Sequence, residues 1–504
     1  MTVSVASVAR AVDVALPGRR RRVRRRLRVL AEAVSGSAPS STRDLVAWLA
    51  EYVGVPSGER LWLVLAVLRA ELPLAEDVVD AVRVARLEGG LAAVAPWLTR
   101  SRWVPTLARR EVRVVSDVVL VDVDHTSTVK FATGIQRVVR ETVKRWVRDH
   151  DPLLVGWTAD HTALRPLTDA QRHTTLTGEW DVAAPPSRWS RLVASDVETV
   201  VIPLGGRYII PELTLDRSIT LRLAAMAEFS STSTSTVGFD AVPLSSAGTT
   251  DYLVSGGFAN NLSAVKHFDR VATISDAARD EYRGWRSMLT SVGLPGPEVE
   301  TVSLPFERTA LPVGATDALE GLSDPAAGPL VVCVGSHEPR KNHLAVLQSA
   351  EVLWREGLAF QLLFVGGNAW ASGYFAAAVA ELRNHGRAVE TVEALTDELL
   401  WEAYREARFT VFPSLNEGFG LPIAESLSAG TPVVTSGYGS MAAIADGRGG
   451  VLVDPRDDRS VADGMRRLLT DDALVVELEA QTRLLPVRDW DDYARELWAY
   501  FSGD

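Results

Sequence analysis

The fold of this chain is most constrained by an alternation between short apolar runs and helical segments, which extends from about residue 113 onward. The run at 118–123, Val-Val-Leu-Val-Asp-Val, is typical, because it is short, apolar and rich in β-branched residues. Runs of this kind, each followed by a helix, predict a parallel sheet covered by helices on both faces. The alternation restarts after residues 311–328, a loop rich in Ala, Gly, Asp and Pro, which predicts two such domains.

The predicted fold class is therefore α/β, with two Rossmann-like doubly wound domains that face a cleft. Strands are expected in the first domain at residues 118–123, 153–158, 200–204, 236–242, 271–275 and 299–304, and in the second at 330–334, 361–365, 388–392, 409–412, 432–435 and 450–453. The expected parts of the chain are 1–112, 113–312, 325–487 and 488–504. Ligands of such sheets bind beyond the carboxyl ends of the strands, so the cleft is the expected site.

Residues 1–112 are predicted to form a helical extension, separate from the two domains and without chemistry of its own. Its notable feature is the basic run Arg19–Arg28, in which eight of ten residues are arginine. The favoured interpretation is a solvated helix face or a disordered arm. The alternative is a peripheral contact with an anionic membrane, to which each basic residue near the surface contributes about 1 kcal/mol.

Composition excludes some function classes. The net charge of −11 argues against a general nucleic-acid binder. The single cysteine, Cys333, lies in an apolar run and is interpreted as core packing, which fits an intracellular protein. The N-terminal apolar stretch is broken by Arg10 and Asp13, and its arginines follow the apolar part, so it does not resemble a signal peptide. A cytoplasmic location is expected, with the inner membrane face as the alternative.

The most informative segment is 411–425, Val-Phe-Pro-Ser-Leu-Asn-Glu-Gly-Phe-Gly-Leu-Pro-Ile-Ala-Glu. A strand is expected to end at Phe412, a glycine-rich loop to follow, and a helix to begin near Pro422, a residue favoured at the first helical position. The backbone N–H groups of Gly418–Leu421 would then point into the cleft and, with the helix dipole, form an anion site.

Two carboxylates frame this loop. Glu417 lies at the strand end and Glu425 eight residues later, inside the helix. Two carboxylates so placed can accept hydrogen bonds from different hydroxyls of one elongated ligand, which assigns sugar hydroxyls to Glu417 and ribose hydroxyls to Glu425. The alternative is that the glycines serve a tight turn and the glutamates are surface charges.

A second strand–loop–helix segment, 334–343, reads Val-Gly-Ser-His-Glu-Pro-Arg-Lys-Asn-His. Arg340 and Lys341 supply the charge that a leaving diphosphate requires, because arginine grips two oxygens and lysine gives a point charge. The alternative is an Arg-Lys pair that caps a surface turn. His337 and His343 lack a set of metal-ligand partners and are interpreted as loop residues, so no metal is expected.

A third segment, 122–141, leads from a strand through a loop into a helix that starts at Thr133-Gly134. This start would face the cleft and touch the donor diphosphate or the acceptor. A simple N-cap followed by a flexible glycine is the alternative.

These three segments together resemble family four of the glycosyltransferases, which has the GT-B fold. Glu417 with Glu425, the segment Glu338–Asn342 and, more weakly, the segment Thr133–Arg137 carry the likeness, which extends over about residues 115–503. The last is similar to bacterial members that build surface polysaccharides. The tail after Trp490 is similar to the closing helix of the family, which crosses back to the first domain.

The resemblance implies transfer with retention of configuration, without a bound metal or cofactor, in which the departing diphosphate helps to take the proton of the acceptor. It implies the catalytic residues Glu417, Asp240, Arg340 and Lys341. It implies the donor-binding residues Gly134, Gly335, Ser336, Arg340, Lys341, Gly366, Asn416, Glu417, Gly418, Phe419, Gly420, Leu421 and Glu425. The implied partners are a GDP-, UDP- or dTDP-activated hexose or deoxyhexose and a glycan or lipid-linked glycan acceptor.

Two departures from the family pattern lower the expected activity. Relatives place a His-Asp pair where this chain has Phe239 and Asp240, and relatives tend to carry Pro-Glu where it has Ala442-Ala443. These changes favour a second hypothesis, a catalytically weak or inactive nucleotide-sugar-binding scaffold. A phosphorylase or a sucrose-type transferase of the same fold is a third, for which no cofactor-bearing lysine motif is recognisable.

Overall fold

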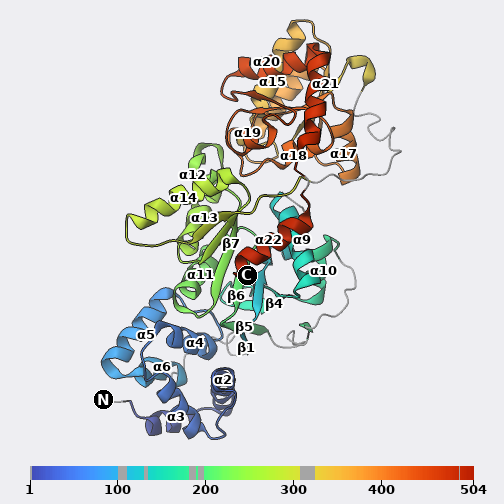
Figure 1. Cartoon of the computed structure of the whole chain (residues 1–504). Helices are drawn as coiled ribbons and strands as arrows, with labels where there is room; N and C mark the ends of the chain where they lie inside the picture. Colours follow the sequence, from blue (N-terminus) through green and yellow to red (C-terminus); the bar gives the residue numbers. More distant parts are fainter. Residues whose placement is uncertain are drawn as a thin grey trace.

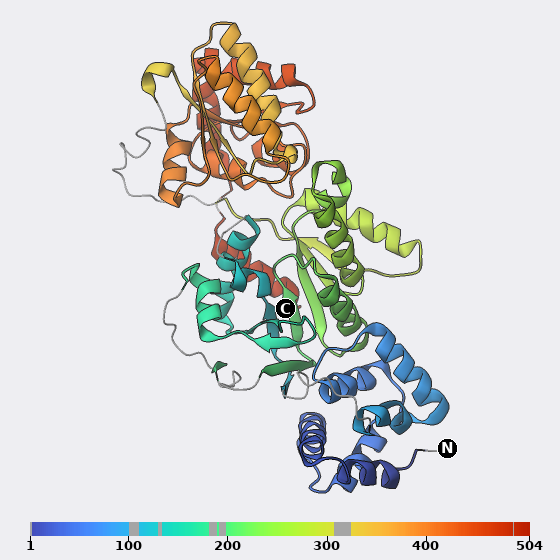
Figure 2. The same ribbon diagram turned by 180° about the vertical axis from the view of Figure 1, so that it is seen from behind.

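The computed structural model describes residues 3–99, 110–129, 134–180, 189–190, 198–306, 324–486 and 488–503. Thr133 of the predicted cleft segment and most of the loop 311–328 lie outside these ranges. The chain forms a helical N-terminal part and two sheet domains (Figure 1). Both views place the helical part at the far end of the first sheet domain, away from the second one (Figure 2).

Short helices build the N-terminal part. They are α1 (Val5–Asp13), α2 (Pro17–Ser35), α3 (Thr42–Tyr52), α4 (Gly58–Arg69), α5 (Ala75–Glu88) and α6 (Gly90–Thr99). Serine side chains cap α1, α3 and α4, and Pro17 begins α2, so local sequence fixes these starts. Every residue from Leu61 to Leu68 of α4 is buried, which makes α4 the central helix.

The helical part is not separate from the sheet that follows, contrary to the prediction. Its apolar core continues into the first sheet domain, where Val200, Ile202 and Leu223 belong to the same cluster of buried residues. α2 and α4 pack beside the edge of the sheet, and α5 packs on a helix of the first domain. The reason is that α4 is apolar on all sides and must be covered on all sides.

The first sheet domain contains a nine-stranded sheet with the order β1-β5-β4-β3-β2-β6-β7-β8-β9. The strands are β1 (Glu111–Ser116), β2 (Val119–Asp122), β3 (Leu153–Trp157), β4 (Leu164–Pro166), β5 (Thr199–Leu204), β6 (Arg207–Ile210), β7 (Ser233–Gly238), β8 (Arg270–Thr273) and β9 (Glu298–Thr301). The prediction of a wholly parallel sheet is wrong at β4, which runs antiparallel to β3 and β5. Only six residues separate β3 from β4, too few for the crossover that a parallel pair requires.

Helices cover the first sheet. They are α8 (Asp124–Thr128), α9 (Gly134–Asp149), α10 (Asp169–Thr177), α11 (Arg217–Phe229), α12 (Val242–Ser245), α13 (Tyr252–Val265) and α14 (Asp276–Thr290). α8 and α9 start beyond the carboxyl end of β2, and α12 starts beyond that of β7. These starts therefore lie at the edge of the sheet where a ligand is expected.

The second sheet domain has six parallel strands in the order β12-β11-β10-β13-β14-β15. The strands are β10 (Leu330–Val334), β11 (Gln361–Val365), β12 (Val389–Val392), β13 (Phe409–Phe412), β14 (Val433–Ser436) and β15 (Gly450–Val453). The helices are α15 (His343–Arg355), α16 (Gly373–Asn384), α17 (Asp397–Glu406), α18 (Leu421–Ser428), α19 (Gly439–Ala445), α20 (Asp458–Thr470) and α21 (Asp472–Gln481). The strand order reverses between β10 and β13, and such a switch point is where doubly wound sheets bind ligands.

The last helix, α22 (Trp490–Ser502), lies against the first sheet domain, where it packs on α9 (Figure 1). The indole Nε1 of Trp146 donates a hydrogen bond of 2.9 Å to the carbonyl oxygen of Ala494. The guanidinium Nη1 of Arg270 donates one of 2.6 Å to the carbonyl oxygen of Tyr500. The chain therefore crosses between the two sheet domains twice, so two connecting segments join the domains.

A charged cluster at the switch point of the second domain

The candidate site lies on two loops that follow β10 and β13 at the switch point. The Arg340 carbonyl oxygen accepts a hydrogen bond of 2.9 Å from the Leu415 N–H. The side-chain amide of Asn342 donates to the carbonyl oxygens of Pro413, at 3.1 Å, and Pro455, at 2.8 Å. These bonds hold the two loops together before any ligand binds.

Glycine is required where the loop after β11 approaches the loop after β10. Gly366 has a φ of +158° and Gly335 one of +147°. A Cβ on Gly366 would lie 2.0 Å from the carbonyl oxygen of Gly335, so no other residue fits there. The Ser336 hydroxyl donates to Glu338 at 3.2 Å, which orients the loop that carries the two cations.

The charges form a compact cluster. One oxygen of Glu417 lies 2.7 Å from Arg340 Nη1, and the other lies 2.7 Å from Lys341 Nζ. The Ser414 hydroxyl donates to Glu417 at 2.6 Å, and Glu338 pairs with Arg340 at 2.8 Å. Only 9% of the Glu417 side chain is exposed. Burial opposes ionisation of this carboxyl, but Lys341 and Arg340 outweigh it and lower the pKa to about 2.

The loop before α18 provides backbone donors beside this cluster. Gly420 has a φ of +110° and precedes the helix, which begins at Leu421, so Pro422 occupies the second helical position and not the first as predicted. Within the described residues, the N–H groups of Gly418 and Phe419 have no hydrogen-bond acceptor. Free N–H groups at a helix start are suited to an anion.

The first domain contacts this loop directly. A Cβ on Gly418 would lie 2.1 Å from the carbonyl oxygen of Phe239, so the two backbones touch. The Ser275 hydroxyl donates to the carbonyl oxygen of Gly418, and the Asn416 amide donates to the Ser245 hydroxyl at 3.0 Å. The loop therefore fills the cleft at this point, and an elongated ligand needs the domains to separate here.

Asp240 lies on the first-domain side of the contact. Its carboxylate accepts a hydrogen bond of 3.1 Å from the Val242 N–H. Burial raises the pKa of Asp240 to about 6, although nearby Arg340 favours the ionised form. Its neighbour Phe239 belongs to an apolar cluster that includes Phe419. Phe239 therefore contributes to the packing between the two domains.

The raised pKa of Asp240 predicts a pH-dependent gain of stability in Asp240→Asn. The wild type binds more protons folded than unfolded between pH 3.8 and about 6, so its stability falls as pH rises through this window. The Asp240→Asn variant has no carboxyl group at this position, so its stability does not fall for this reason as pH rises. We expect Asp240→Asn to match the wild type near pH 4 and to exceed it above pH 6 by roughly 1–3 kcal/mol, allowing for the partial exposure of the residue. Urea unfolding across this range measures the difference, and a constant difference would contradict the assignment.

Glu425 is engaged by other partners than the two cations. One of its oxygens lies 2.6 Å from Arg137 Nη1 of the first domain. The other accepts a hydrogen bond of 2.8 Å from the Tyr404 hydroxyl. The structure therefore brings together Arg340, Lys341 and Glu417, whereas Glu425, predicted to accept ribose hydroxyls, is part of an interdomain ion pair.

The remaining predicted donor residues have mainly packing roles in this structure. A Cβ on Gly134 would lie 3.2 Å from Leu421 Cδ1, so the start of α9 meets the start of α18. The ring of Phe419 lies 6.0 Å from that of Phe306. The alanines of Ala442–Ala443 lie in α19, where the Ser440 hydroxyl donates to the Glu417 carbonyl oxygen at 2.8 Å.

His337 and His343 are both buried; His337 lies in the loop after β10, as predicted, whereas His343 is the first residue of α15 and not a loop residue. Their exposed fractions are 6% and 3%. The His337 ring lies 4.2 Å from the Phe375 ring, and the His343 ring lies 5.4 Å from the Phe364 ring. Burial lowers the pKa of His343 to about 3, so both belong to the neutral core beside β10.

No site role was predicted from the sequence for Arg137 and Tyr404, the two residues that contact Glu425. Arg137 lies in the segment with the weaker resemblance to the glycosyltransferase family. Its contact with Glu425 could not be predicted because the two residues are far apart in the sequence. Tyr404 occupies a helical position with no distinguishing neighbours. Such residues are recognised only after the fold brings them together.

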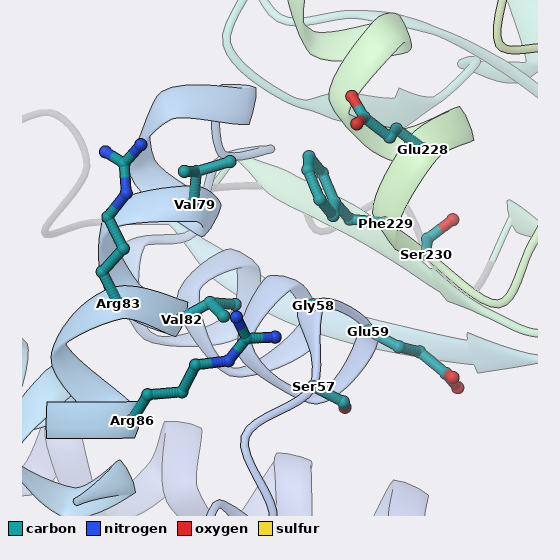
Figure 3. A pocket seen from close by; sticks show the side chains of 10 residues that line it. All are labelled: Ser57, Gly58, Glu59, Val79, Val82, Arg83, Arg86, Glu228, Phe229 and Ser230. Carbon is teal, nitrogen blue, oxygen red and sulfur yellow. The ribbon is translucent and has the colours of Figure 1, made fainter. Parts of the chain in front are cut away.

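A cavity of about 560 Å³ lies elsewhere, between the helical part and the first domain (Figure 3). It is lined by Ser57, Gly58, Glu59, Val79, Val82, Arg83, Arg86, Glu228, Phe229 and Ser230. It lies beside the C-terminal end of α11, where α4 and α5 of the helical part meet the first sheet domain. The clustered charges at the switch point favour that region as the candidate site.

None of the helices in the described ranges combines the length and the apolar character needed to span a bilayer.

The segment 328–471 matches the family model described as Glycosyl transferases group 1. Serotype-specific mannosyltransferase WbdA of Escherichia coli is 30% identical over 181 residues, which cover 34% of this chain and 21% of WbdA. D-inositol 3-phosphate glycosyltransferase of Acidothermus cellulolyticus is 34% identical over 209 residues, which cover 38% of this chain and 46% of that protein.

Solved structures share the two-domain fold. Sucrose-phosphate synthase from Thermosynechococcus elongatus superposes with a TM-score of 0.52 and 17% identity, over 76% of this chain and 98% of that one. WaaG, a glycosyltransferase involved in lipopolysaccharide biosynthesis, superposes with a TM-score of 0.50 and 14% identity, over 77% of this chain and all of that one. At these identities the likeness shows the fold alone.

The fold is thus the GT-B fold, as the resemblance implied. The match of residues 328–471 to the Glycosyl transferases group 1 model confirms the predicted family resemblance in the second sheet domain. The matched part of the chain spans about a fifth of WbdA and about half of the inositol-phosphate enzyme.

Proposed function

We propose that this chain transfers a hexose or deoxyhexose from a nucleotide-sugar donor to a glycan or lipid-linked glycan, with retention of configuration and without a metal. The observation that carries the proposal is the cluster of Arg340, Lys341 and Glu417 at the switch point of a glycosyltransferase group 1 domain. Relatives named as mannosyltransferases make a mannosyl donor the first one to test.

The cluster can supply what the reaction requires. Negative charge develops on the diphosphate as its bond to the sugar breaks, and two fixed cations stabilise that charge. The N–H groups of Gly418 and Phe419 add backbone donors at the same place. Glu417 is fixed by the two cations and accepts hydrogen bonds from the sugar hydroxyls, and Glu425 is assigned to the ribose.

An inactive scaffold of the same fold is the competing function. The observation that favours it is the direct contact of Gly418 with Phe239, which leaves no room for a donor until the domains separate. Movement of whole domains about a few connecting residues is common in enzymes that bind ligands in a cleft. The closed contact is therefore compatible with both hypotheses. Turnover of a donor distinguishes the transferase from the inactive scaffold.

The experiment is a screen for slow donor hydrolysis. The full chain is incubated with GDP-mannose, UDP-glucose and dTDP-rhamnose, and released sugar and nucleotide are measured. Release from one donor, abolished in Glu417→Gln, supports a transferase. Binding of a donor without release, in the presence or absence of glycan acceptors, supports the scaffold, and absence of binding to all donors contradicts both.

We also propose that the protein works at the inner face of the cell membrane, held there by part of the basic run of α2. Arg26 is 1% exposed and donates to the Leu68 carbonyl oxygen, and Arg19 donates to that of Leu98, so these side chains serve the fold. The arginines exposed to solvent are Arg20, Arg21, Arg25 and Arg28. Beside them, Val14 and Leu16 are 84% and 80% exposed. Cations next to exposed apolar residues are suited to an anionic lipid surface.

Flotation with lipid vesicles tests this membrane contact. Each basic residue near an anionic surface contributes about 1 kcal/mol, so glutamine at Arg20, Arg21, Arg25 and Arg28 should reduce binding to phosphatidylglycerol vesicles at least tenfold. The wild type should not bind neutral phosphatidylcholine vesicles. Glutamine at four exposed arginines elsewhere, Arg283, Arg355, Arg383 and Arg495, is the matched control. Equal flotation of the wild type and the α2 variant would remove the membrane contact.

A further inference from the structure

The ion pair between Arg137 and Glu425 joins the two domains across the cleft. Arg137 lies on the first turn of α9, and Glu425 lies on α18. The two side chains are 31% and 12% exposed, and their closest atoms are 2.6 Å apart. This pair therefore lies partly shielded from water, where an ion pair is stronger than at a free surface.

Glu425 presents a single available oxygen to the cleft. The buried Tyr404 hydroxyl donates to the other oxygen at 2.8 Å, and this contact lies wholly within the second domain. The oxygen bound by Arg137 is the one that faces the first domain. A ribose hydroxyl that donates to this oxygen competes for it with the Arg137 guanidinium.

The released guanidinium would lie beside the proposed diphosphate position. α9 begins where α18 begins, since a Cβ on Gly134 would lie 3.2 Å from Leu421 Cδ1. Arg137 is one helical turn from Gly134, and its partner Glu425 is one helical turn from Leu421, where α18 begins. A guanidinium can bind two phosphate oxygens at once, and it stays charged.

We infer that Arg137 is a donor-binding residue that exchanges partners, from Glu425 in the free protein to the donor diphosphate in the complex. This inference rests on the proposed donor site. Because Arg137 belongs to the first domain and Glu425, Arg340 and Lys341 to the second, the exchange lets one ligand replace the ion pair as the link between the domains. Donor binding and domain arrangement are thereby coupled.

The exchange predicts opposite effects on two kinds of ligand. Arg137→Gln frees Glu425, so a nucleoside, which has ribose but no phosphate, should bind about two- to fivefold more tightly. The same variant removes a phosphate contact, so a nucleoside diphosphate should bind about tenfold or more weakly. A purely structural loosening of the domains would shift both affinities in the same direction.

Isothermal calorimetry on the full chain measures these affinities with guanosine, uridine and thymidine and with GDP, UDP and dTDP. Lys144→Gln is the matched control, because Lys144 is a cation of the same helix that pairs only locally with Glu141. If Arg137→Gln does not fold, Arg137→Lys replaces it, with shifts of the same signs and smaller size. Equal-sign shifts or unchanged affinities would overturn the exchange alone. Failure of the wild type to bind any of the six ligands would overturn the donor site as well.

Discussion

Replacing Arg340 and Lys341 together by alanine should abolish measurable binding of nucleoside diphosphates and destabilise the second domain by about 3–5 kcal/mol. Binding is lost because each charge-assisted contact with the diphosphate contributes about 1.5–3 kcal/mol. Stability is lost because Glu417, 9% exposed, would remain buried without the two cations that keep it ionised. Calorimetric titration with GDP, UDP and dTDP measures the first effect, and urea unfolding measures the second.

Two further variants separate these effects. Adding Glu417→Ala to the double variant removes the unpaired carboxylate, so stability should recover while binding stays absent. Arg355→Ala with Arg383→Ala removes two exposed cations from the same domain, and each pair contributes at most about 1 kcal/mol. Retained diphosphate binding in the first double variant would show that these cations do not hold the donor.

Glu417→Gln should lower the rate of transfer, or of donor hydrolysis, by about 100- to 1000-fold while nucleoside diphosphates bind as tightly as before or more tightly. The carboxylate occupies both Arg340 and Lys341, so its neutralisation makes the two cations more available to phosphate. The same change replaces one of the two acceptor oxygens assigned to the sugar hydroxyls by an NH2 donor and removes the negative charge, which lowers the rate of the chemical step. Single-turnover kinetics and calorimetry measure the two effects in one preparation.

The same mutation at an exposed glutamate provides the control for Glu417→Gln. Glu390 is 57% exposed and pairs with Arg383, so Glu390→Gln should change neither rate nor affinity. Loss of diphosphate affinity in Glu417→Gln, in parallel with the loss of rate, would mean that Glu417 only maintains the loops. In that case its assignment to the sugar would be wrong.

The strands of the second domain were predictable because their patterns are plain. Buried parallel strands read as apolar runs, and the expected starts agree with β10–β15 to within one residue. The strands of the first domain were harder to predict from the sequence. β7 begins with Ser233-Thr-Ser-Thr236, whose residues are largely buried although their sequence is typical of a loop. The predicted start of this strand, Thr236, therefore lies three residues after the observed one. β1, β4 and β6 were missed because they are short or carry polar residues.

The candidate site was predictable as far as local sequence determines it. The strand–loop–helix segments identify Arg340, Lys341 and Glu417, and the fold places each of the two cations 2.7 Å from a Glu417 oxygen. The partners of Glu425 could not be predicted, since Arg137 lies 288 positions away. Contacts between domains depend on how two rigid bodies meet, and no local pattern encodes that arrangement.

The most direct test of the account is a crystal structure of this chain with the nucleoside diphosphate that binds most tightly in calorimetry. The account predicts diphosphate oxygens within hydrogen-bond distance of Arg340, Lys341 and the N–H of Gly418 or Phe419, with the ribose at Glu425 and Gly418 separated from Phe239. A diphosphate bound elsewhere, with Arg340 and Lys341 still paired to Glu417 and the cleft still closed, would contradict it.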